Sequence, residues 1–204
     1  MPPHMSPDPK DLPLRCRCGR VRGVASEVAP YAGFRFVCYC QDCQTFARFL
    51  ERPDVLDAAG GTDIFQMPTG RVKLTAGTDA VRCLHFSRKV FRWYTECCLT
   101  PIGNTAGPRF PVVGLIHAFI SRDVDGRTRN QVLGAPLCRL FENSAVGPLP
   151  LSAPPPRSLG LVARRGPTLI GWWLRGLGRP HPFFDHTGTP LSAPRVMTQS
   201  ERAT

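Results

Sequence analysis

The chain has 204 residues, the size of one domain with appendages, and its 42% hydrophobic content is enough for a packed core. The 22 prolines and 19 glycines predict many turns and few long helices. No apolar run reaches the roughly 20 residues that a membrane-spanning helix needs, so we expect no membrane span. The polar, proline-rich start differs from a signal peptide, and we therefore expect a cytoplasmic protein.

The formal charge is +11 at pH 7. The densest group of basic residues lies in the last third of the chain and comprises Arg157, Arg164, Arg165, Arg175 and Arg179. Aromatic residues do not alternate with these arginines as they do in proteins that bind single-stranded nucleic acid. The pattern favours a solvated basic surface, or attraction to a small anion, over nucleic acid as a partner.

The first half of the chain predicts a tail, two strands and a helix. Residues 1–14 are polar and predict a flexible tail, and residues 21–28 alternate weakly, as a strand does. Residues 34–37 alternate strongly and predict a strand that leads into Cys38. Residues 42–50 have helical spacing, with Asp42 as the expected N-cap.

The following segments predict short strands joined by turns. We expect strands at 64–67 and 72–77, a hairpin of 81–86 and 91–95, a loop at 100–105, and a buried strand or strand pair within 110–120. The expected fold class is therefore mainly β, an antiparallel sandwich with few short helices, and the domain spans residues 15–146.

Residues 147–204 predict a C-terminal extension. A proline-rich linker at 147–157 precedes an expected helix at 167–177, which begins with Pro167. Its apolar side comprises Leu169, Ile170, Trp173, Leu174 and Leu177. Docking of this side on the domain or on a second subunit is the favoured interpretation, and a membrane surface is the alternative. The segment 181–185 is expected to anchor the tail through its phenylalanines.

Seven of the nine cysteines fall into three clusters, which are Cys16 with Cys18, Cys38 with Cys40 and Cys43, and Cys97 with Cys98. Thiolates one or two residues apart can turn toward one metal ion, whereas a Cys-x-Cys pair is poorly placed for a disulfide. In a reducing compartment such clusters bind metal more often than they pair. Gly19, directly after the first cluster, allows a positive φ where the backbone turns around an ion.

The number of thiols predicts two Zn²⁺ sites. The first and third clusters supply four ligands, as in a closed structural site, and the middle cluster supplies three, which leaves an open position of the catalytic kind. Two filled sites would reduce the formal charge to about +8.

The ordered motifs resemble the glutathione-dependent formaldehyde-activating enzyme family, whose domain centromere protein V shares. The resemblance rests on Cys-x-Cys-Gly at 16–19, Cys-x-Cys-x-x-Cys at 38–43, Gly-Gly-Thr at 60–62 before a strand, and an aromatic strand that ends in cysteine with Thr100 beyond it. It covers residues 14 to 120 and implies a zinc-containing, mainly β fold. It also implies the joining of formaldehyde to glutathione as S-hydroxymethylglutathione, a carbon–sulfur lyase chemistry.

Carried over to this chain, the resemblance implies that Cys16 and Cys18 belong to the structural zinc. It likewise implies that Cys38, Cys40 and Cys43 hold the catalytic zinc. The third cluster departs from the family pattern, which is Cys-x-x-Cys-Gly followed by Ser or Thr.

If Thr100 keeps its family place, Cys98 matches the second family cysteine and Thr95 occupies the position of the first. Cys97 is the favoured substitute ligand. Cys83 is its rival, because the expected hairpin register places it opposite Tyr94 and close to the third cluster. The isolated Cys138 is expected to be a core thiol.

Two functions remain open. The first is a zinc-dependent enzyme that acts on glutathione, or a related small thiol, and on a small aldehyde. Arg48 and Arg92 are candidates to hold the carboxylates of the peptide and His85 to carry a proton, although structural roles are simpler for all three. The second is a non-catalytic, zinc-stabilised binding module, which can associate with nucleic acid through its basic surface; the altered third cluster and the long extension favour it.

Overall fold

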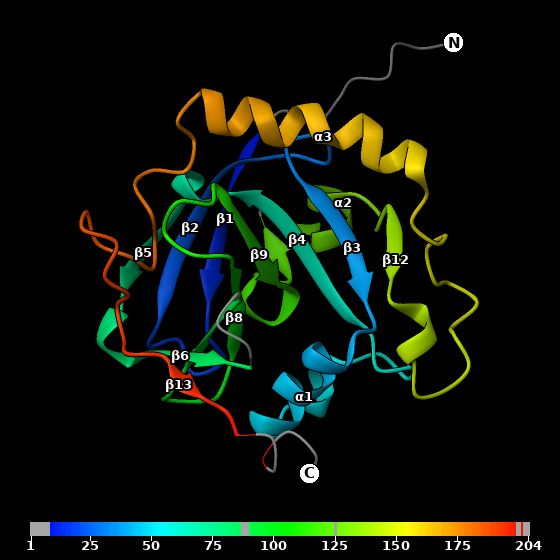
Figure 1. The fold of residues 1–204 in the computed structure, drawn as a ribbon, viewed down its shortest axis with the longest axis horizontal. Coiled ribbons are helices and arrows are strands. Elements are labelled where there is room, and N and C mark those ends of the chain that lie inside the picture. Colours follow the sequence, from blue (N-terminus) through cyan, green and yellow to red (C-terminus); the bar gives the residue numbers. More distant parts are fainter. Residues whose placement is uncertain (1–8, 87–89, 125, 199–200, 202–204) are drawn as a thin grey trace.

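The structure of the chain is a computed structural model that describes residues 9–86, 90–124, 126–198 and 201 (Figure 1). Its fold is mainly β with few helices, as predicted. Within the described residues the strands form an eight-stranded sheet, a three-stranded sheet and a two-stranded hairpin.

The large sheet has the strand order β12-β3-β4-β9-β8-β7-β6-β13. In chain order its members are β3 (Phe34–Cys38), β4 (Thr62–Pro68), β6 (Val81–His85), β7 (Phe91–Thr95), β8 (Pro101–Thr105), β9 (Val112–Ile116), β12 (Cys138–Leu140) and β13 (Arg195–Val196). Neighbouring strands are antiparallel except at the two edges, where β12 runs parallel to β3 and β13 parallel to β6. The antiparallel interior agrees with the prediction, and the parallel edges come from the C-terminal third.

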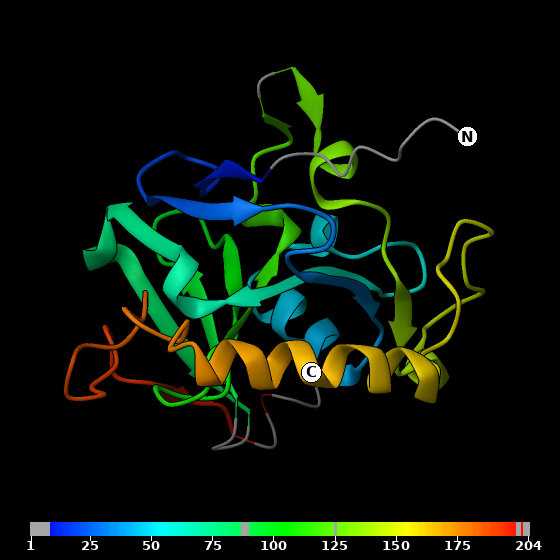
Figure 2. The same cartoon turned by 90° about the horizontal axis from the view of Figure 1, so that it is seen from above.

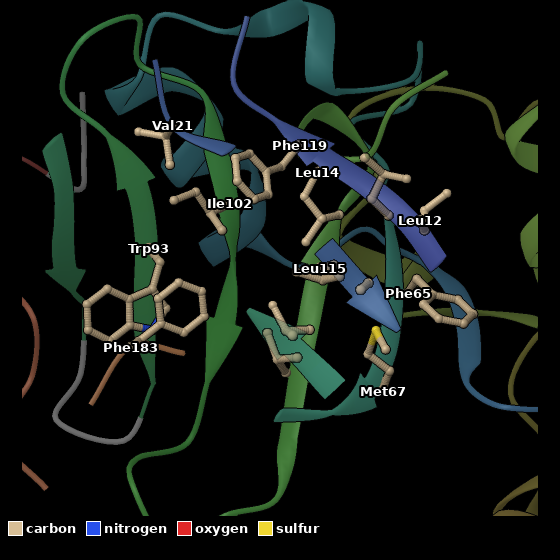
Figure 3. Close-up of a cluster of buried hydrophobic side chains, with 14 of the residues drawn as sticks. Leu12, Leu14, Val21, Phe65, Met67, Trp93, Ile102, Leu115, Phe119 and Phe183 are labelled. Carbon is tan, nitrogen blue, oxygen red and sulfur yellow. The ribbon is translucent and has the colours of Figure 1, made fainter. Parts of the chain in front are cut away.

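The small sheet covers one face of the large one. It comprises β1 (Lys10–Arg15), β2 (Arg22–Val28) and β5 (Val72–Ala76), in the order β1-β2-β5. Figure 3 shows the core between the two sheets, where Leu12 and Leu14 of β1 point toward Phe65 and Met67 of β4 and toward Leu115 of β9. Each of these five side chains is at most 1% exposed, so this interface is the main hydrophobic core.

A helix covers the opposite face of the large sheet. Helix α1 (Gln41–Phe49) follows β3 directly and packs Phe46 against a second core, which contains Ile64, Leu84 and Ile116 of the sheet. The molecule is thus layered, with the small sheet, the large sheet and α1 in succession. The predicted helix at 42–50 is confirmed to within one residue at each end.

Two predictions for the segments before the C-terminal extension were wrong. Residues 10–14 belong to β1 rather than to a flexible tail, because alternate leucines there bury themselves in the main core. Residues 101–105 form β8, a central strand rather than a loop. Pro101 is tolerated because it is the first residue of the strand, and Gly103 is needed because a Cβ there would lie 2.5 Å from the carbonyl oxygen of Gly114.

The connecting elements are short. The hairpin of β10 (Asp123–Val124) and β11 (Arg127–Thr128) leads into α2 (Arg129–Leu133), and Figure 2 shows this hairpin projecting beyond β1 and β2. The 3-10 turns lie at Pro53–Val55, Thr69–Arg71, Thr78–Ala80, His117–Phe119 and Glu142–Ser144. The expected hairpin turn at 87–90 falls mostly outside the described residues.

Helix α3 (Leu159–Leu174) crosses the molecule near the beginning of β3 (Figures 1 and 2). The predicted range, 167–177, was wrong: Ser158 caps the helix, its hydroxyl accepting from Leu161 N at 3.2 Å, and the helix continues through Pro167. Trp172 faces the domain and is 7% exposed, whereas Ile170, Trp173 and Leu174 are 60–72% exposed. For these three residues, docking on the domain is therefore wrong, and docking on a second subunit stays a prediction.

The C-terminal segment is part of the domain. Phe183 is fully buried and its ring stacks on Trp93, with centroids 4.7 Å apart (Figure 3). This contact confirms the expected anchor within 181–185. Of the helices that the structure describes, none combines the length and the apolar character that crossing a membrane requires.

Candidate metal centres

The four-thiol group consists of Cys16, Cys18, Cys97 and Cys98, whose sulfurs all lie within 4.8 Å of one another. The first two follow β1 and the last two follow β7, so the group forms where the small sheet meets the large one. The Sγ–Sγ distance is 3.5 Å between Cys16 and Cys18 and 3.3 Å between Cys18 and Cys97. With zinc–sulfur bonds of about 2.3 Å, tetrahedral ligands lie about 3.8 Å apart, so the group has the size of a tetrathiolate site.

Two left-handed turns bring these thiols together. Gly19 has a φ of +78°, as predicted, and its N–H donates to the Cys16 carbonyl at 3.0 Å. Leu99 has a φ of +51°, a conformation that a branched side chain adopts rarely. This turn directly follows the vicinal pair, so the backbone departs from its favoured region where Cys97 and Cys98 both face the group.

Thr100 stabilises the ionised form of the Cys98 thiol. Its Oγ1 accepts hydrogen bonds from Arg17 N at 3.1 Å and Arg52 Nη1 at 3.3 Å, and lies 3.2 Å from the sulfur of Cys98. A hydroxyl has two lone pairs and one proton, so the proton points at the sulfur. Burial opposes ionisation of Cys98, but hydrogen bonds from Thr100 and Thr95 outweigh it and lower the pKa to about 5.

Cys83 lies outside this group, although it was the predicted rival of Cys97. The hairpin pairs Cys83 with Trp93, one residue away from the expected Tyr94, and the thiol is 1% exposed within the main core. Burial raises its pKa to about 12. Cys138 is likewise fully buried, in the second core.

The three-thiol group consists of Cys38, Cys40 and Cys43, again with all sulfurs within 4.8 Å. Cys38 ends β3 and Cys43 lies in the first turn of α1. Cys40 is the N-cap of that helix, a role predicted for Asp42, and its sulfur accepts from Cys43 N at 3.4 Å. Cys38 and Cys43 are buried and Cys40 is half-buried, so the group opens toward solvent on one side.

The charge of Arg92 lies beside this group. The side chain is 5% exposed, with Nη1 4.0 Å from the Cys43 sulfur and Nη2 3.2 Å from the Asp42 carboxylate. The guanidinium carbon lies 4.8 Å from the ring centroid of Phe86. Its Nε is buried and has no hydrogen-bond partner among the described residues. A buried cation is therefore held against the thiols with one donor unused.

These surroundings give the three thiols different acidities. Hydrogen bonds from Cys38 and Cys43 lower the pKa of Cys40 to about 2. For Cys38 the effect is opposite, because its hydrogen bonds with Cys40 and Cys43, together with burial, raise its pKa. For Cys43, the hydrogen bond with Cys38 lowers the pKa, but that with Cys40, together with burial, raises it to about 12. The first negative charge thus resides on Cys40, at the positive end of α1.

The other predicted residues do not join the group. Arg48 is exposed, and its guanidinium donates to Thr45 Oγ1 at 3.0 Å. His85 lies opposite Phe91 in the hairpin and packs against that ring, with centroids 4.2 Å apart. Arg92 and Phe91 are neighbours in one strand, so His85 points to the face of the sheet opposite to Arg92.

Both groups can hold a metal ion. Their donors are thiols alone, the soft ligands that bind Zn²⁺ well, and their sizes suit one ion each. Within the part of the chain that the structure describes, these are the clusters of three or more Cys, His, Asp or Glu donors that meet this spacing.

Comparison with known proteins gives a family but no activity. A search of curated proteins found no match. A protein-family model described as "Family of unknown function (DUF6151)" matches residues 8–193, which include both thiol groups, α3 and the phenylalanine anchor. The chain therefore belongs to the DUF6151 family.

Proposed function

We propose that the chain is a zinc protein with a structural ion in the four-thiol group and an open, reactive ion in the three-thiol group. One observation carries the proposal: three thiol donors converge at the end of β3 and the start of α1, and no fourth Cys, His, Asp or Glu donor among the described residues joins them. Three protein ligands with one free position is the catalytic pattern.

The reaction we propose is the addition of a small thiol, glutathione or a relative, to a small aldehyde such as formaldehyde. A carbon–sulfur bond forms as the thiol proton passes to the carbonyl oxygen, which gives an S-hydroxymethyl product. A bound zinc ion would keep the substrate sulfur ionised and polarise the carbonyl. Arg92 supplies fixed positive charge at this point, with Nη1 4.0 Å from the Cys43 sulfur, and this charge favours the negative charge that develops on oxygen.

The backbone at the third cluster supports the resemblance on which this chemistry rests. The formaldehyde-activating family has glycine after its last metal-binding cysteine, and this chain has Leu99 there, with a φ of +51°. A left-handed residue is what a glycine position implies. The departure from the family motif therefore changes the residue and keeps the turn.

The test is the rate of S-hydroxymethylglutathione formation from glutathione and formaldehyde, measured by NMR exchange with the zinc-loaded, full-length chain. We expect Cys40→Ser to reduce this rate to that of the uncatalysed reaction, because it removes one of three ligands at a half-buried position. Cys83→Ala removes a thiol that lies outside both groups and should leave the rate unchanged. Full glutathione-dependent activity in Cys40→Ser would contradict the proposed reaction.

A second function has its own support. A cavity on the inner side of Cys43, lined by neither Cys38 nor Cys40, has a volume of about 10 Å³, which is room for roughly one water molecule and not for a tripeptide. This favours a zinc-stabilised binding module without catalysis, in which the three-thiol group stabilises the junction of β3 and α1. Such a module can lose that ion and keep its fold, and its basic surface makes nucleic acid a candidate partner.

We also propose a cytoplasmic location. All nine cysteines are free thiols, including pairs within 4 Å of each other. A reducing compartment preserves this state, and thiolate metal sites are typical of it.

A further inference from the structure

A basic cavity lies beside the four-thiol group and is separate from the three-thiol group. Its volume is about 620 Å³, within the range of small-molecule sites. The end of β1, the turn after α1 and the residues on either side of the β10–β11 hairpin meet there, and five arginines line it: Arg15, Arg17, Arg52, Arg122 and Arg129. The single acidic residue in the lining is Asp54.

The nearby carboxylates are already paired. Asp54 receives two hydrogen bonds of 2.7 Å from Arg52. Asp63, on the neighbouring strand β4, receives hydrogen bonds of 2.9 Å and 2.6 Å from Arg35. The remaining arginines of the cavity therefore have no carboxylate partner among the described residues.

Arg129 is the least satisfied of them. It begins α2, and its Nη1 donates to the His117 carbonyl at 3.0 Å, but its Nε is buried without a partner among the described residues. Burial lowers the pKa of Arg129, and the positive charges of Arg35 and Arg122 lower it further, whereas the negative charge of Asp63 raises it. A half-buried cation with an unused donor, close to other cations, is unfavourable unless an anion completes the site.

The metal site accounts for only part of this charge. Five arginines and one aspartate give the lining a charge of +4. Cys16 also lines the cavity, and a tetrathiolate zinc site carries about −2, which would leave about +2.

We propose that this cavity binds the phosphate group of a small molecule. A phosphate presents several oxygens to several guanidinium forks at once, which suits arginines gathered around one hollow. The lining contains no Phe, Tyr or Trp on which bases could stack, and the arginines converge rather than follow a track, so a nucleic-acid strand fits less well.

A second cavity adjoins the first and has room for the rest of the phosphate-bearing ligand. It has a volume of about 420 Å³ and shares Asp54, His117 and Arg129 with the basic cavity. Its lining also includes Asn130 and the carboxylates of Asp57 and Asp63, which are already paired with Tyr39 and Arg35. The phosphate binds in the first cavity, and the uncharged or weakly polar part of the same molecule extends into the second.

The test is calorimetric titration of the full-length chain with inorganic phosphate at constant ionic strength, with chloride as the reference anion. We expect saturable binding of one phosphate per chain. Arg129→Gln and, separately, the exposed Arg122→Gln should each weaken binding about tenfold, the loss of roughly one charge-assisted hydrogen bond. Arg127→Gln removes the same charge from the same hairpin but from outside the lining, and should change the affinity less than twofold.

Three outcomes would overturn the proposal. The first is phosphate heats equal to those of chloride. The second is equal binding by the native chain, Arg122→Gln and Arg129→Gln; because Arg122 is exposed, that variant is expected to fold even if Arg129→Gln does not. The third is strongly salt-dependent binding of a single-stranded oligonucleotide without saturable binding of phosphate, which would assign the charge to nucleic acid.

Discussion

Thr100 connects the four-thiol group to its surroundings. Its hydroxyl accepts from Arg17 N and from Arg52, and donates to Cys98. Groups of this kind orient metal ligands and set their charge. The sequence identified this threonine only as a landmark of the family motif, because nothing in its spacing shows which sulfur a hydroxyl proton faces.

Thr100→Val should weaken zinc binding by the four-thiol group about 10- to 100-fold, because Cys98 loses the donor that stabilises its thiolate. The measurement is competition with a chromophoric chelator. Thr100→Ser restores the hydroxyl and should recover most of the affinity. A native affinity in Thr100→Val would show that the hydroxyl has no part in ligand charge.

His181 makes the native state sensitive to acid. Its Nδ1 accepts from Phe183 N at 3.1 Å, and burial lowers its pKa from 6.5 to about 4. As the pH falls, the imidazole is therefore protonated in the unfolded chain before it is protonated in the folded chain. The free energy of unfolding that is present above pH 6.5 is lost as the pH falls toward 4, at roughly 1.4 kcal/mol per pH unit within that window.

His181→Asn keeps an acceptor near the Phe183 N–H but does not titrate. Its free energy of unfolding, measured by urea denaturation, should fall less than that of the native chain between pH 6.5 and pH 5. Equal acid sensitivity of the two proteins would contradict a buried, neutral His181.

At the scale of elements, helix α3 has one packed side and one apolar exposed side. Trp172 contacts the domain and borders a cavity of about 250 Å³ between α3 and the β3 region, whereas its neighbour Trp173 is 65% exposed. Helical spacing alone finds an apolar stripe but does not show which side a tertiary contact uses. For this reason Ile170, Trp173 and Leu174 of the predicted apolar side are exposed.

Two substitutions separate these roles. Trp172→Ala should lower the free energy of unfolding by about 3 kcal/mol, because it removes a buried indole. Trp173→Ala should change it by at most about 0.5 kcal/mol, since little of its surface is buried. Urea denaturation of both variants tests this, and a larger loss for Trp173→Ala would mean that the outward side is packed in solution.

Elements with strong local signals were predictable and those fixed by distant contacts were not. The alternation before Cys38 and the hairpin of β6 and β7 predicted their strands. The strand β8 was missed because Pro101 and Gly103 suggest a loop, and only its neighbours β7 and β9 make it a strand. The one-residue error in the hairpin register arose because the turn residues 87–89 do not specify the turn.

At the scale of the molecule, each thiol group lies where two layers meet. The four-thiol group joins the end of β1 in the small sheet to the end of β7 in the large sheet, and the three-thiol group joins β3 to α1. Clustered cysteines were found from spacing alone, since Cys-x-Cys is informative without a fold. The basic cavity was not found, because its arginines come from separated segments.

Both metal sites can be tested at once by measuring zinc per chain with elemental analysis, for the native protein beside a Cys38→Ser/Cys40→Ser double variant, with circular dichroism to compare their folds. We expect two zinc ions in the native protein and one in the variant, with the fold intact. One zinc ion in both proteins would contradict this expectation, because the three-thiol group would then hold no metal and the proposed chemistry would have no site.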